Sequence, residues 1–327
     1  MPTSGPIFIT GPDRSGTTLL YALFASHPDI SMVRRSNMWR WFYGNYGDLR
    51  DAAALDRCLS DLLRYQRLQP LEPDEARIRQ EFAAGPQTYG RLFALFHEHL
   101  AERRGTPRWG DKSLHTEYDA DAIFEAHPDA RMLHLVRDPR DRYASVVRRR
   151  GPGEAKGIIA ATGRWLASMR AARRNVRRYP DRYMIVRYET LATMPESTTQ
   201  AVCRFIDAPY DPVMLTMSGA PDHDAVGGNS SFEAIEPGVI STRSIGRYRA
   251  ILDPADIAFI QTCARPSMLR HGYEIERLPG STGDRARRYG PDFALRVIRL
   301  AGWFAVDAWQ SQRGTAVPDE RLTPVAS

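Results

Sequence analysis

A short apolar strand that runs through a glycine-bounded turn into a helix constrains this chain most. Residues 7–10 form an apolar, mostly β-branched run, and the chain then turns through Gly11 and Gly16 before an apolar helical pattern begins. This order of elements aims several backbone N–H groups and the positive end of a helix dipole at one point. The segment therefore predicts a binding site for an anion such as phosphate or sulfate.

The spacing of this turn is close to the nucleotide-binding P-loop, G-x-x-x-x-G-K-[ST]. Gly11, Gly16 and Thr18 take the expected positions, but Thr17 stands where the lysine would be, and Arg14 is the cation of the loop. A loop that keeps the backbone cradle but moves the cation should bind a phosphate in another register. An ordinary strand-to-helix turn is the alternative, so the rest of the chain has to decide.

The composition is that of a globular protein with a modest basic excess. The chain has 327 residues, of which 43% are hydrophobic and 26% charged, and its net charge is +6. The excess rests on arginine and indicates an anionic ligand or partner. Cys58, Cys203 and Cys263 are far apart and predict neither a metal site nor a set of disulfides. We find no membrane span and no signal-peptide pattern, so the sequence predicts a cytoplasmic protein.

A second candidate anion site follows a second buried strand. Residues 131–136 read as that strand, and Asp138 before a proline is a good helix N-cap. Ser145 and Arg149 lie four residues apart and share a helix face, while Arg137 stands at the end of the strand. Two guanidinium groups and a hydroxyl suit a phosphate. The basic end of this helix is equally compatible with a solvated helix terminus.

Two further stretches lie between these motifs. Asp111, Lys112 and His115 fall within five residues, either around a short strand or on a surface loop. Residues 31–46 are rich in arginine and aromatic side chains. They form either a surface-covering segment or the wall of a substrate cleft beside the first loop.

Strands that alternate with helices predict an α/β fold, a P-loop-NTPase-like, mostly parallel sheet flanked by helices. The candidate anion loops should then meet at the carboxyl edge of the sheet. A nucleotide phosphorylated at both ends of its ribose would fill both anion sites.

We predict one domain over residues 1–278, followed over 279–327 by a linker (279–283) and an amphipathic helix (293–310). That helix should pack on the domain or on a partner subunit, and peripheral membrane contact is also compatible with it.

In these motifs the chain resembles a known family, the sulfotransferases that use 3′-phosphoadenosine-5′-phosphosulfate (PAPS). The resemblance is to the branch that includes bacterial enzymes and the tyrosylprotein type. It rests on GPDRSGTT at 11–18, which is similar to the family's 5′-phosphosulfate loop, and LVRDPRDRYAS at 135–145, which is similar to its 3′-phosphate motif. Weaker matches are DKS at 111–113, VRYETL at 186–191 and IGRY at 245–248. The matches run in the family's order from about residue 6 to about residue 275.

The resemblance implies transfer of a sulfuryl group from PAPS to an acceptor hydroxyl or amine, with the bisphosphate PAP as product and no metal. It assigns the donor to a set of residues in both motifs. The 5′-phosphate would lie on Ser15, Gly16, Thr17 and Thr18, the 3′-phosphate on Arg137, Ser145 and Arg149, and the adenine near Tyr188.

Sulfuryl transfer gathers negative charge on equatorial and leaving oxygens, so fixed cations lower the barrier. Arg14 and Lys112 are the candidates. The acceptor also needs a base. The tyrosylprotein branch has a glutamate shortly after the His-Pro-Asp segment, where this chain has Arg34 and Arg35. We therefore predict His115 as the general base, with Glu117 behind it.

The missing glutamate argues against a protein-tyrosine substrate, and the arginines nearby favour a small-molecule or amphipathic acceptor.

Two other functions fit parts of the sequence. A P-loop ATP-dependent kinase or NTPase should show the loop lysine and an acidic Mg²⁺ ligand. A basic nucleic-acid-binding protein should show a recognisable binding motif, and we find none. A catalytically inactive family member and a homodimer are further alternatives.

Overall fold

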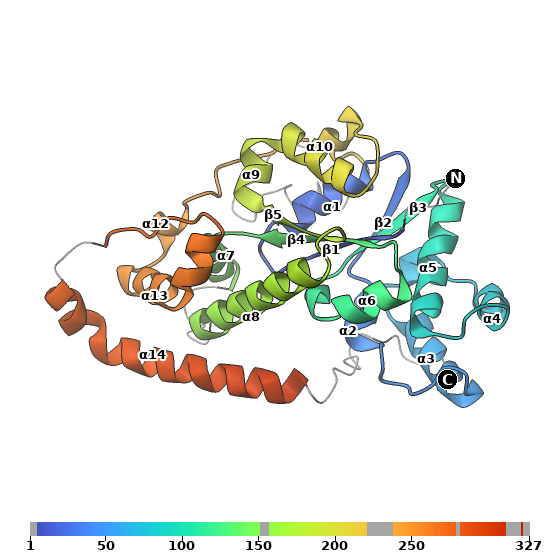
Figure 1. Cartoon of the computed structure of the whole chain (residues 1–327), viewed down its shortest axis with the longest axis horizontal. Helices are drawn as coiled ribbons and strands as arrows, with labels where there is room; N and C mark the ends of the chain where they lie inside the picture. Colours follow the sequence, from blue (N-terminus) through green and yellow to red (C-terminus); the bar gives the residue numbers. More distant parts are fainter. Residues whose placement is uncertain (1–4, 151–156, 221–237, 279–281, 312–321, 323–327) are drawn as a thin grey trace.

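The structure is a computed structural model that describes residues 5–150, 157–220, 238–278, 282–311 and Leu322. Its centre is a five-stranded sheet in the order β2-β3-β1-β4-β5, with every pair parallel (Figure 1). The α/β prediction with a mostly parallel sheet is thus confirmed. The strands are β1 Ile7–Thr10, β2 Ile30–Arg34, β3 Arg108–Lys112, β4 Arg131–Val136 and β5 Tyr183–Arg187.

Alternating side chains of the strands build a core on each face of the sheet. Ile7 and Ile9 of β1 face α1 (Thr17–Ala25), whereas Phe8 between them faces the opposite core. Figure 1 shows α1, α9 and α10 on one side of the sheet and α5, α6 and α8 on the other. These helices are α9 Tyr188–Thr193, α10 Pro195–Phe205, α5 Tyr89–Arg103, α6 Ala120–Ala126 and α8 Gly157–Arg178.

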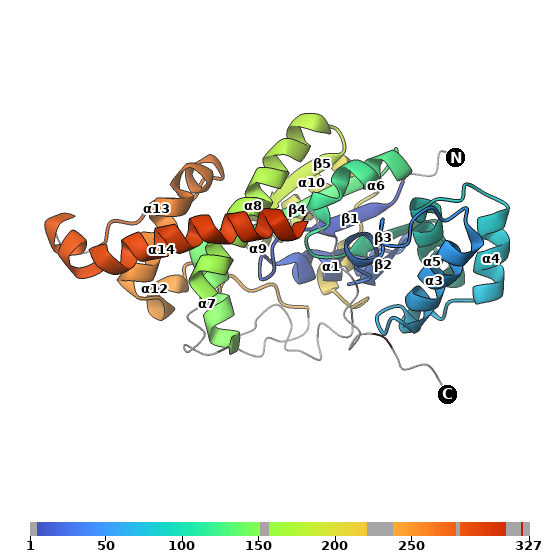
Figure 2. The ribbon, with the colours of Figure 1, turned by 90° about the horizontal axis from the view of Figure 1, so that it is seen from below.

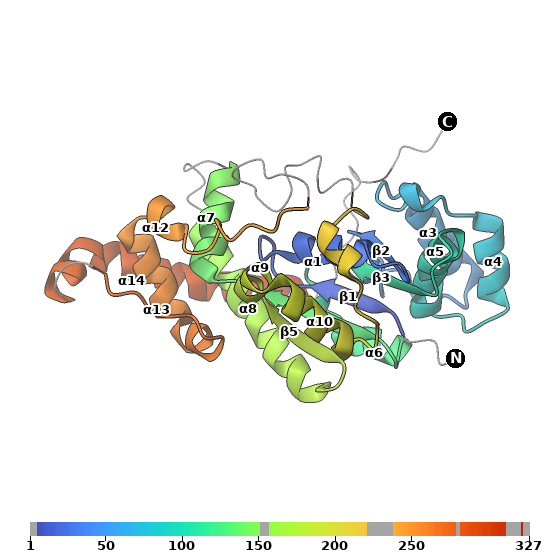
Figure 3. The ribbon, with the colours of Figure 1, turned by 90° about the horizontal axis from the view of Figure 1, so that it is seen from above.

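Short polar side chains start several helices where the sequence places them. Asp51, Asp74 and Thr88 each accept a hydrogen bond from a backbone N–H in the first turn of α3 (Ala52–Arg64), α4 (Glu75–Ala83) and α5 respectively. These three helices gather at one end of the molecule (Figure 3). The short helix α2 spans Met38–Trp41. The 3₁₀ turns are η1 Gln69–Leu71, η2 Thr116–Tyr118 and η3 Pro212–Thr216.

The opposite end holds α7 (Pro139–Arg150), α12 (Tyr248–Ile251), α13 (Pro254–Arg270) and α14 (Thr282–Ser311). Figure 2 shows α14 as a long helix running along the molecule. It packs on α8 at Gly163, where an added Cβ would lie 2.3 Å from the Trp303 ring, and Arg296 pairs with Asp256 of α13 at 2.6 Å.

The C-terminal helix is longer than the sequence predicts. It begins at Thr282, so the predicted linker over 279–283 is wrong at its last two positions. Residues 279–281 lie outside the described part. None of the helices described is long and apolar enough to cross a membrane.

The strand order fixes where a ligand would bind. After β1 the chain moves to β2 and β3 on one side, and then crosses to β4 and β5 on the other. The carboxyl ends of β1 and β4 therefore flank the point where the direction of winding reverses, which is where open parallel sheets bind ligands. The loop at 11–16 and Arg137 both lie at this edge.

Candidate active site

The loop after β1 needs its two glycines for steric reasons. Gly11 has a φ of 131°, and an added Cβ would lie 2.5 Å from the Leu135 carbonyl oxygen. Gly16 has a φ of 89°, and its Cβ would lie 2.2 Å from the Tyr188 ring. Both the backbone conformation and the space exclude a side chain. The loop therefore packs tightly on β4 and on the start of α9.

A buried arginine of α7 anchors this loop. Arg142 is fully buried and forms an ion pair with the Asp13 carboxylate. Its Nε also donates to the Asp13 carbonyl oxygen at 2.8 Å, and its Nη1 donates to the Ala161 carbonyl oxygen at 2.8 Å. Burial alone would raise the pKa of Asp13, but the charge and hydrogen bond of Arg142 outweigh it and lower that pKa. The sequence reasoning did not single out this pair.

The two predicted anion motifs meet directly. Arg14 Nε donates to Ser145 Oγ at 3.0 Å, and Arg137 Nη1 donates to the Arg14 carbonyl oxygen at 3.2 Å. Arg137 also lies over the Tyr188 ring, 4.5 Å from its centroid. Its Nη2 donates at 2.8 Å to the carbonyl oxygen of Ser244, a residue that the sequence reasoning missed. Arg14, Arg137, Ser145 and Tyr188 thus form one cluster, as predicted.

Two buried donors in this cluster have no hydrogen-bond partner. They are Ser15 Oγ, in the first loop, and Arg137 Nε, at the end of β4. Buried polar groups are nearly always paired, so such atoms call for a ligand or water. Thr17 and Thr18 open α1 beside them, where helical N–H groups have no partner within the helix. Both motifs therefore offer unused donors to an anion.

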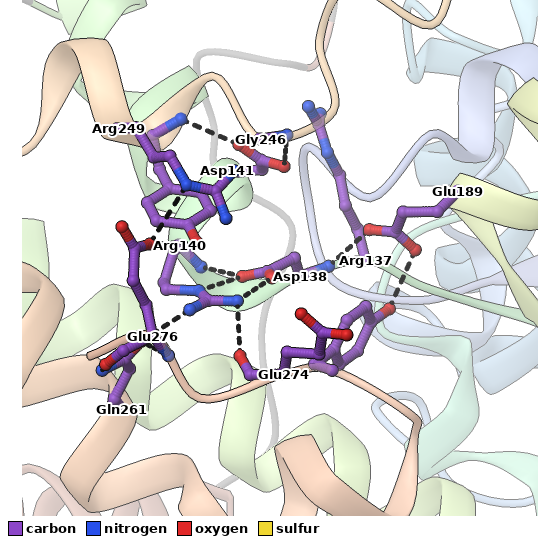
Figure 4. A network of polar contacts seen from close by, with 12 residues as sticks. Arg137, Asp138, Arg140, Asp141, Glu189, Gly246, Arg249, Gln261, Glu274 and Glu276 are labelled. Atoms are coloured by element: carbon purple, nitrogen blue, oxygen red, sulfur yellow. Dashed lines mark hydrogen bonds and ion pairs between the residues drawn. The ribbon is translucent and has the colours of Figure 1, made fainter.

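A hydrogen-bonded frame holds the start of α7 (Figure 4). Asp138 caps the helix, because its Oδ1 accepts from the Arg140 N–H at 2.9 Å. The Asp138 N–H in turn donates to Glu189 Oε1 at 2.9 Å, which ties α7 to α9. Arg140 also donates to Gln261 of α13 at 2.6 Å and lies over the Tyr248 ring. This frame fixes the position of the neighbouring Arg137.

Lys112 reaches the same edge from β3. Its register partners are Ile9 of β1 and Arg34 of β2, and its side chain is 2% exposed. Burial, followed by the charges of Arg35, Arg34 and Arg14, lowers the pKa of Lys112 to about 7. A buried cation surrounded by other cations calls for an anion.

His115 lies beyond Lys112 in a left-handed conformation with a φ of 69°, and its ring stacks on Tyr118 at 6.1 Å. Burial, together with the charge of Arg40, lowers the pKa of His115, while the carboxylate of Glu117 opposes this shift. The histidine is therefore neutral near pH 7, as a proton acceptor must be.

Glu117 was predicted to stand behind His115, and the structure shows a different arrangement. Its carboxylate is fully buried and accepts hydrogen bonds from Thr10 Oγ1 at 2.5 Å and Ser168 Oγ at 2.6 Å. Burial would raise the pKa of Glu117, but nearby histidines and these hydrogen bonds lower it. Glu117 thus acts on His115 through its charge, within a buried network that also contains His134.

The aromatic and arginine-rich segment contributes to a cavity of about 430 Å³. The segment over 31–46 thus supplies part of a cavity wall, which is one of the two predicted alternatives. Trp39 and Phe42 of the same segment are instead buried in the core. The lining residues are Arg35, Asn37, Arg40, Trp41, Tyr65, Gln66, Arg67, Leu114 and His115.

Arg149, the remaining residue of the predicted 3′-phosphate site, continues α7, but its side chain lies outside the described part of the structure.

Backbone strain is concentrated here. Of the seven non-glycine residues with positive φ among those described, four belong to this site: Arg14, Arg35, Asn37 and His115. Such conformations cost about 1–3 kcal/mol each and persist only where the surroundings impose them. The strained residues thus gather around the two candidate anion loops and the cavity.

Comparison with known proteins identifies the family. A model of the sulfotransferase family matches residues 6–212. The chain belongs to the sulfotransferase family. The matched region contains β1 to β5 and with them the loop at 11–16, Lys112 and Arg137. The predicted family is thereby confirmed.

The relatives of this chain are distant. It is 26% identical over 215 residues to a protein-tyrosine sulfotransferase of Drosophila melanogaster, which covers 64% of this chain and 39% of the fly protein. It is 23% identical over 289 residues to protein-tyrosine sulfotransferase A of Caenorhabditis elegans, covering 86% of this chain and 70% of the relative. The chain thus spans well under half of the fly relative's length.

Solved structures confirm the fold. The sulfotransferase domain from the Synechococcus PCC 7002 olefin synthase superimposes with a TM-score of 0.58 at 23% identity, over 84% of this chain and 95% of that domain. The sulfotransferase domain from the curacin biosynthetic pathway gives a TM-score of 0.54 at 21% identity, over 83% and 99% of the two chains. At these identities the likeness speaks for the fold alone.

Proposed function

We propose that this sulfotransferase moves a sulfuryl group from PAPS to a hydroxyl or amine of a small-molecule, glycan or lipid acceptor. One observation carries the proposal: the two candidate anion-binding motifs meet at one sheet edge, where Arg14 bonds to Ser145, and each motif holds a buried donor without a partner. A nucleotide with a phosphate on each side of its ribose supplies an anion to both motifs. A triphosphate supplies its charges at one end only.

The donor would be held by the residues that the motifs place together. Ser15 Oγ and the N–H groups of residues 16–18 suit the 5′-phosphate at the start of α1. Arg137 and Ser145 suit the 3′-phosphate, and the Tyr188 ring offers a surface for the adenine. We propose that Arg149 adds a further cation to the 3′ end.

The chain's own groups would then support the transfer. The acceptor oxygen forms a bond to sulfur while the bond from sulfur to the phosphate oxygen breaks, and the bisphosphate leaves. Arg14 and Lys112 would stabilise the charge that gathers on the sulfuryl and leaving oxygens. His115, which is neutral near pH 7, would take the acceptor's proton.

Ligand binding tests the proposal without knowledge of the acceptor. Adenosine 3′,5′-bisphosphate should raise the melting temperature and bind in calorimetry without added metal, and ATP should bind at least about 10-fold more weakly. Arg137→Gln should weaken the bisphosphate by about 10–150-fold, because a hydrogen bond to a charged group contributes about 1.5–3 kcal/mol. Arg79→Gln, in the exposed ion pairs of α4, is the matched control.

Equal stabilisation by ATP, or no stabilisation by the bisphosphate, would refute the donor assignment and favour a nucleotide triphosphate enzyme or an inactive relative. Labelled PAPS then tests transfer, since radioactive sulfate must appear on an acceptor only when the active protein is present.

A further inference from the structure

The cavity beside Lys112 has an unusual lining for a site that receives a neutral alcohol. Arg35, Arg40 and Arg67 line it together with His115, and none of the described lining residues is an aspartate or glutamate. Trp41 and Tyr65 supply apolar surface, with their rings 5.6 Å apart in an edge-on arrangement. The lining is therefore both aromatic and strongly cationic.

The walls of this cavity are held rigidly. Asn37 donates through its backbone N–H to Ser113 Oγ at 2.9 Å, and through Nδ2 to the Arg35 carbonyl oxygen at 2.9 Å and the Tyr65 hydroxyl at 3.0 Å. The Arg35 N–H donates to the Lys112 carbonyl oxygen at 2.7 Å. Arg35 and Asn37 both have positive φ, which these bonds stabilise. The arginines are thus presented by a preformed wall that ends at the sulfuryl edge of the site.

Several cations gather where the donor site and the cavity meet. Arg14 and Lys112 already lie where the phosphosulfate would bind. The charges of Arg34 and Arg35 reach Lys112 closely enough to lower its pKa, and Arg34 Nη1 is buried without a hydrogen-bond partner. The charge of Arg40 acts on Asp119. It lowers the pKa of that carboxyl, whereas burial raises this pKa by more. Arg35 and Arg67 line the cavity on the acceptor side of the donor.

We propose that the acceptor is a small anionic molecule, which presents a hydroxyl to His115 while its own carboxylate or phosphate binds Arg35 and Arg67. This inference rests on the proposed sulfuryl transfer and specifies its substrate class. A guanidinium binds carboxylate and phosphate through the same fork of N–H donors. The apolar part of the acceptor would lie against the Trp41 side of the cavity lining. A volume of about 430 Å³ is within the range of small-molecule pockets.

The test compares phenols that share one ring and chain and differ in charge. The probes are 3-(4-hydroxyphenyl)propionate, its methyl ester, tyramine, 2-(4-hydroxyphenyl)ethyl phosphate and a tyrosyl peptide with flanking aspartates. With saturating PAPS, kcat/KM should be about 10–150-fold higher for the carboxylate than for the ester, as expected for charge-assisted hydrogen bonds in a partly shielded site. Tyramine should be the poorest phenol. The ratio of carboxylate to phosphate identifies which anion the site prefers.

Variants assign the preference to residues. Arg35→Gln and Arg67→Gln should each reduce the carboxylate-to-ester ratio by about 5-fold or more. Arg67 is exposed, so its replacement leaves the folded structure intact even where Arg35→Gln lowers stability. Arg79→Gln should leave the ratio unchanged.

Calorimetry of the carboxylate phenol with the protein–bisphosphate complex gives a readout that does not depend on turnover. Equal rates for carboxylate and ester, unchanged ratios in both variants, or no binding of either anionic phenol would each overturn the inference. A peptide that outperforms every small phenol would overturn its small-molecule part. Transfer to neutral phenols with bisphosphate binding intact would leave the proposed function standing while this inference fails. Failure of the bisphosphate to bind would refute the proposed function itself.

Discussion

Lys112 should titrate near neutral pH in the free protein, and this makes donor binding depend on pH. Its side chain is 2% exposed, and burial, followed by the charges of Arg35 and Arg34, lowers the pKa of Lys112 to about 7. A bound phosphosulfate or bisphosphate favours the charged ammonium and should return the pKa towards its ordinary value of about 10.4. Binding at a pH above 7 must therefore take up a proton.

The size of the effect follows from the linkage between proton and ligand binding. With a free pKa of about 7, the dissociation constant is multiplied by 1 + 10^(pH − 7), about 4 at pH 7.5 and about 100 at pH 9. Adenosine 3′,5′-bisphosphate should therefore bind about 25-fold more weakly at pH 9, a loss of about 1.9 kcal/mol. Affinity is full below pH 7 and falls as the pH rises. The comparison between pH 7.5 and pH 9 also lies above the second ionisation of the phosphates, near pH 6.

The titration of Lys112 can be observed selectively, because the chain has two lysines, Lys112 and Lys156. NMR of protein labelled at the lysine ε-carbon should show one signal that titrates near pH 7 and moves to high pH when the bisphosphate is added. Lys156→Gln assigns the signals and is the matched control. Lys112→Gln should make bisphosphate affinity independent of pH between 7.5 and 9. A Lys112 signal that titrates near pH 10 in the free protein, or a wild-type affinity that is flat over this range, would refute the argument from crowded cations.

Three further results follow from the site. Gly11→Ala should lower the free energy of unfolding by about 2–4 kcal/mol in urea titrations, because its Cβ meets a β4 carbonyl at a positive φ; Gly302→Ala, with open space around it, should not. Asp13→Asn should cost about 2–3 kcal/mol, less than a fully buried pair because Asp13 is partly exposed, and should weaken the bisphosphate by loosening the loop that Arg142 anchors. His115→Gln should lower kcat by about 10²–10⁴ with little change in bisphosphate affinity. It should also abolish the acidic limb of the kcat/KM profile, which in the wild type lies below pH 6.5 because the pKa of His115 is lowered by burial.

Regular elements with strong local signals were predicted closely. The strands over 7–10 and 131–136 have the predicted bounds. Both are short, mainly apolar runs, one beginning after a proline and the other ending at charged residues, so local physics suffices.

The strands that carry the chemistry were harder to predict. β2 was missed because its apolar run is short and leads into arginines, which made the whole segment look like a surface covering. β3 ends in Gly110, Asp111 and Lys112, and all three are buried. A strand that places a lysine and an aspartate inside the sheet edge violates the apolar pattern by which strands are recognised. The signal was weak because buried charged residues interrupt the apolar run of this short strand.

Contacts between distant parts of the chain were beyond any local pattern. Arg142 and Asp13 are 129 residues apart, and Arg137 and Ser244 are 107 apart. Both arginines belong to a stretch in which several arginines look alike in the sequence. The fold separates them by burial: Arg142 anchors the loop and is fully buried, whereas Arg148 is exposed. Only the three-dimensional arrangement distinguishes an anchoring arginine from a solvated one.

The displaced cation of the first loop now has a physical explanation. In a P-loop the lysine sits in the loop itself and serves a phosphate chain that extends from one end of the nucleoside. Here Arg14 bonds to Ser145 of the second motif, while Lys112 supplies a cation from a neighbouring strand. The loop is thereby coupled to the second anion site, and charge is moved towards the cavity lined by Arg35. A lysine at Thr17 would concentrate charge within the loop, whereas this arrangement spreads it from the second candidate anion site to the cavity. Under the proposed function, this spread of charge serves a donor with phosphates on both sides of its ribose and the proposed anionic acceptor.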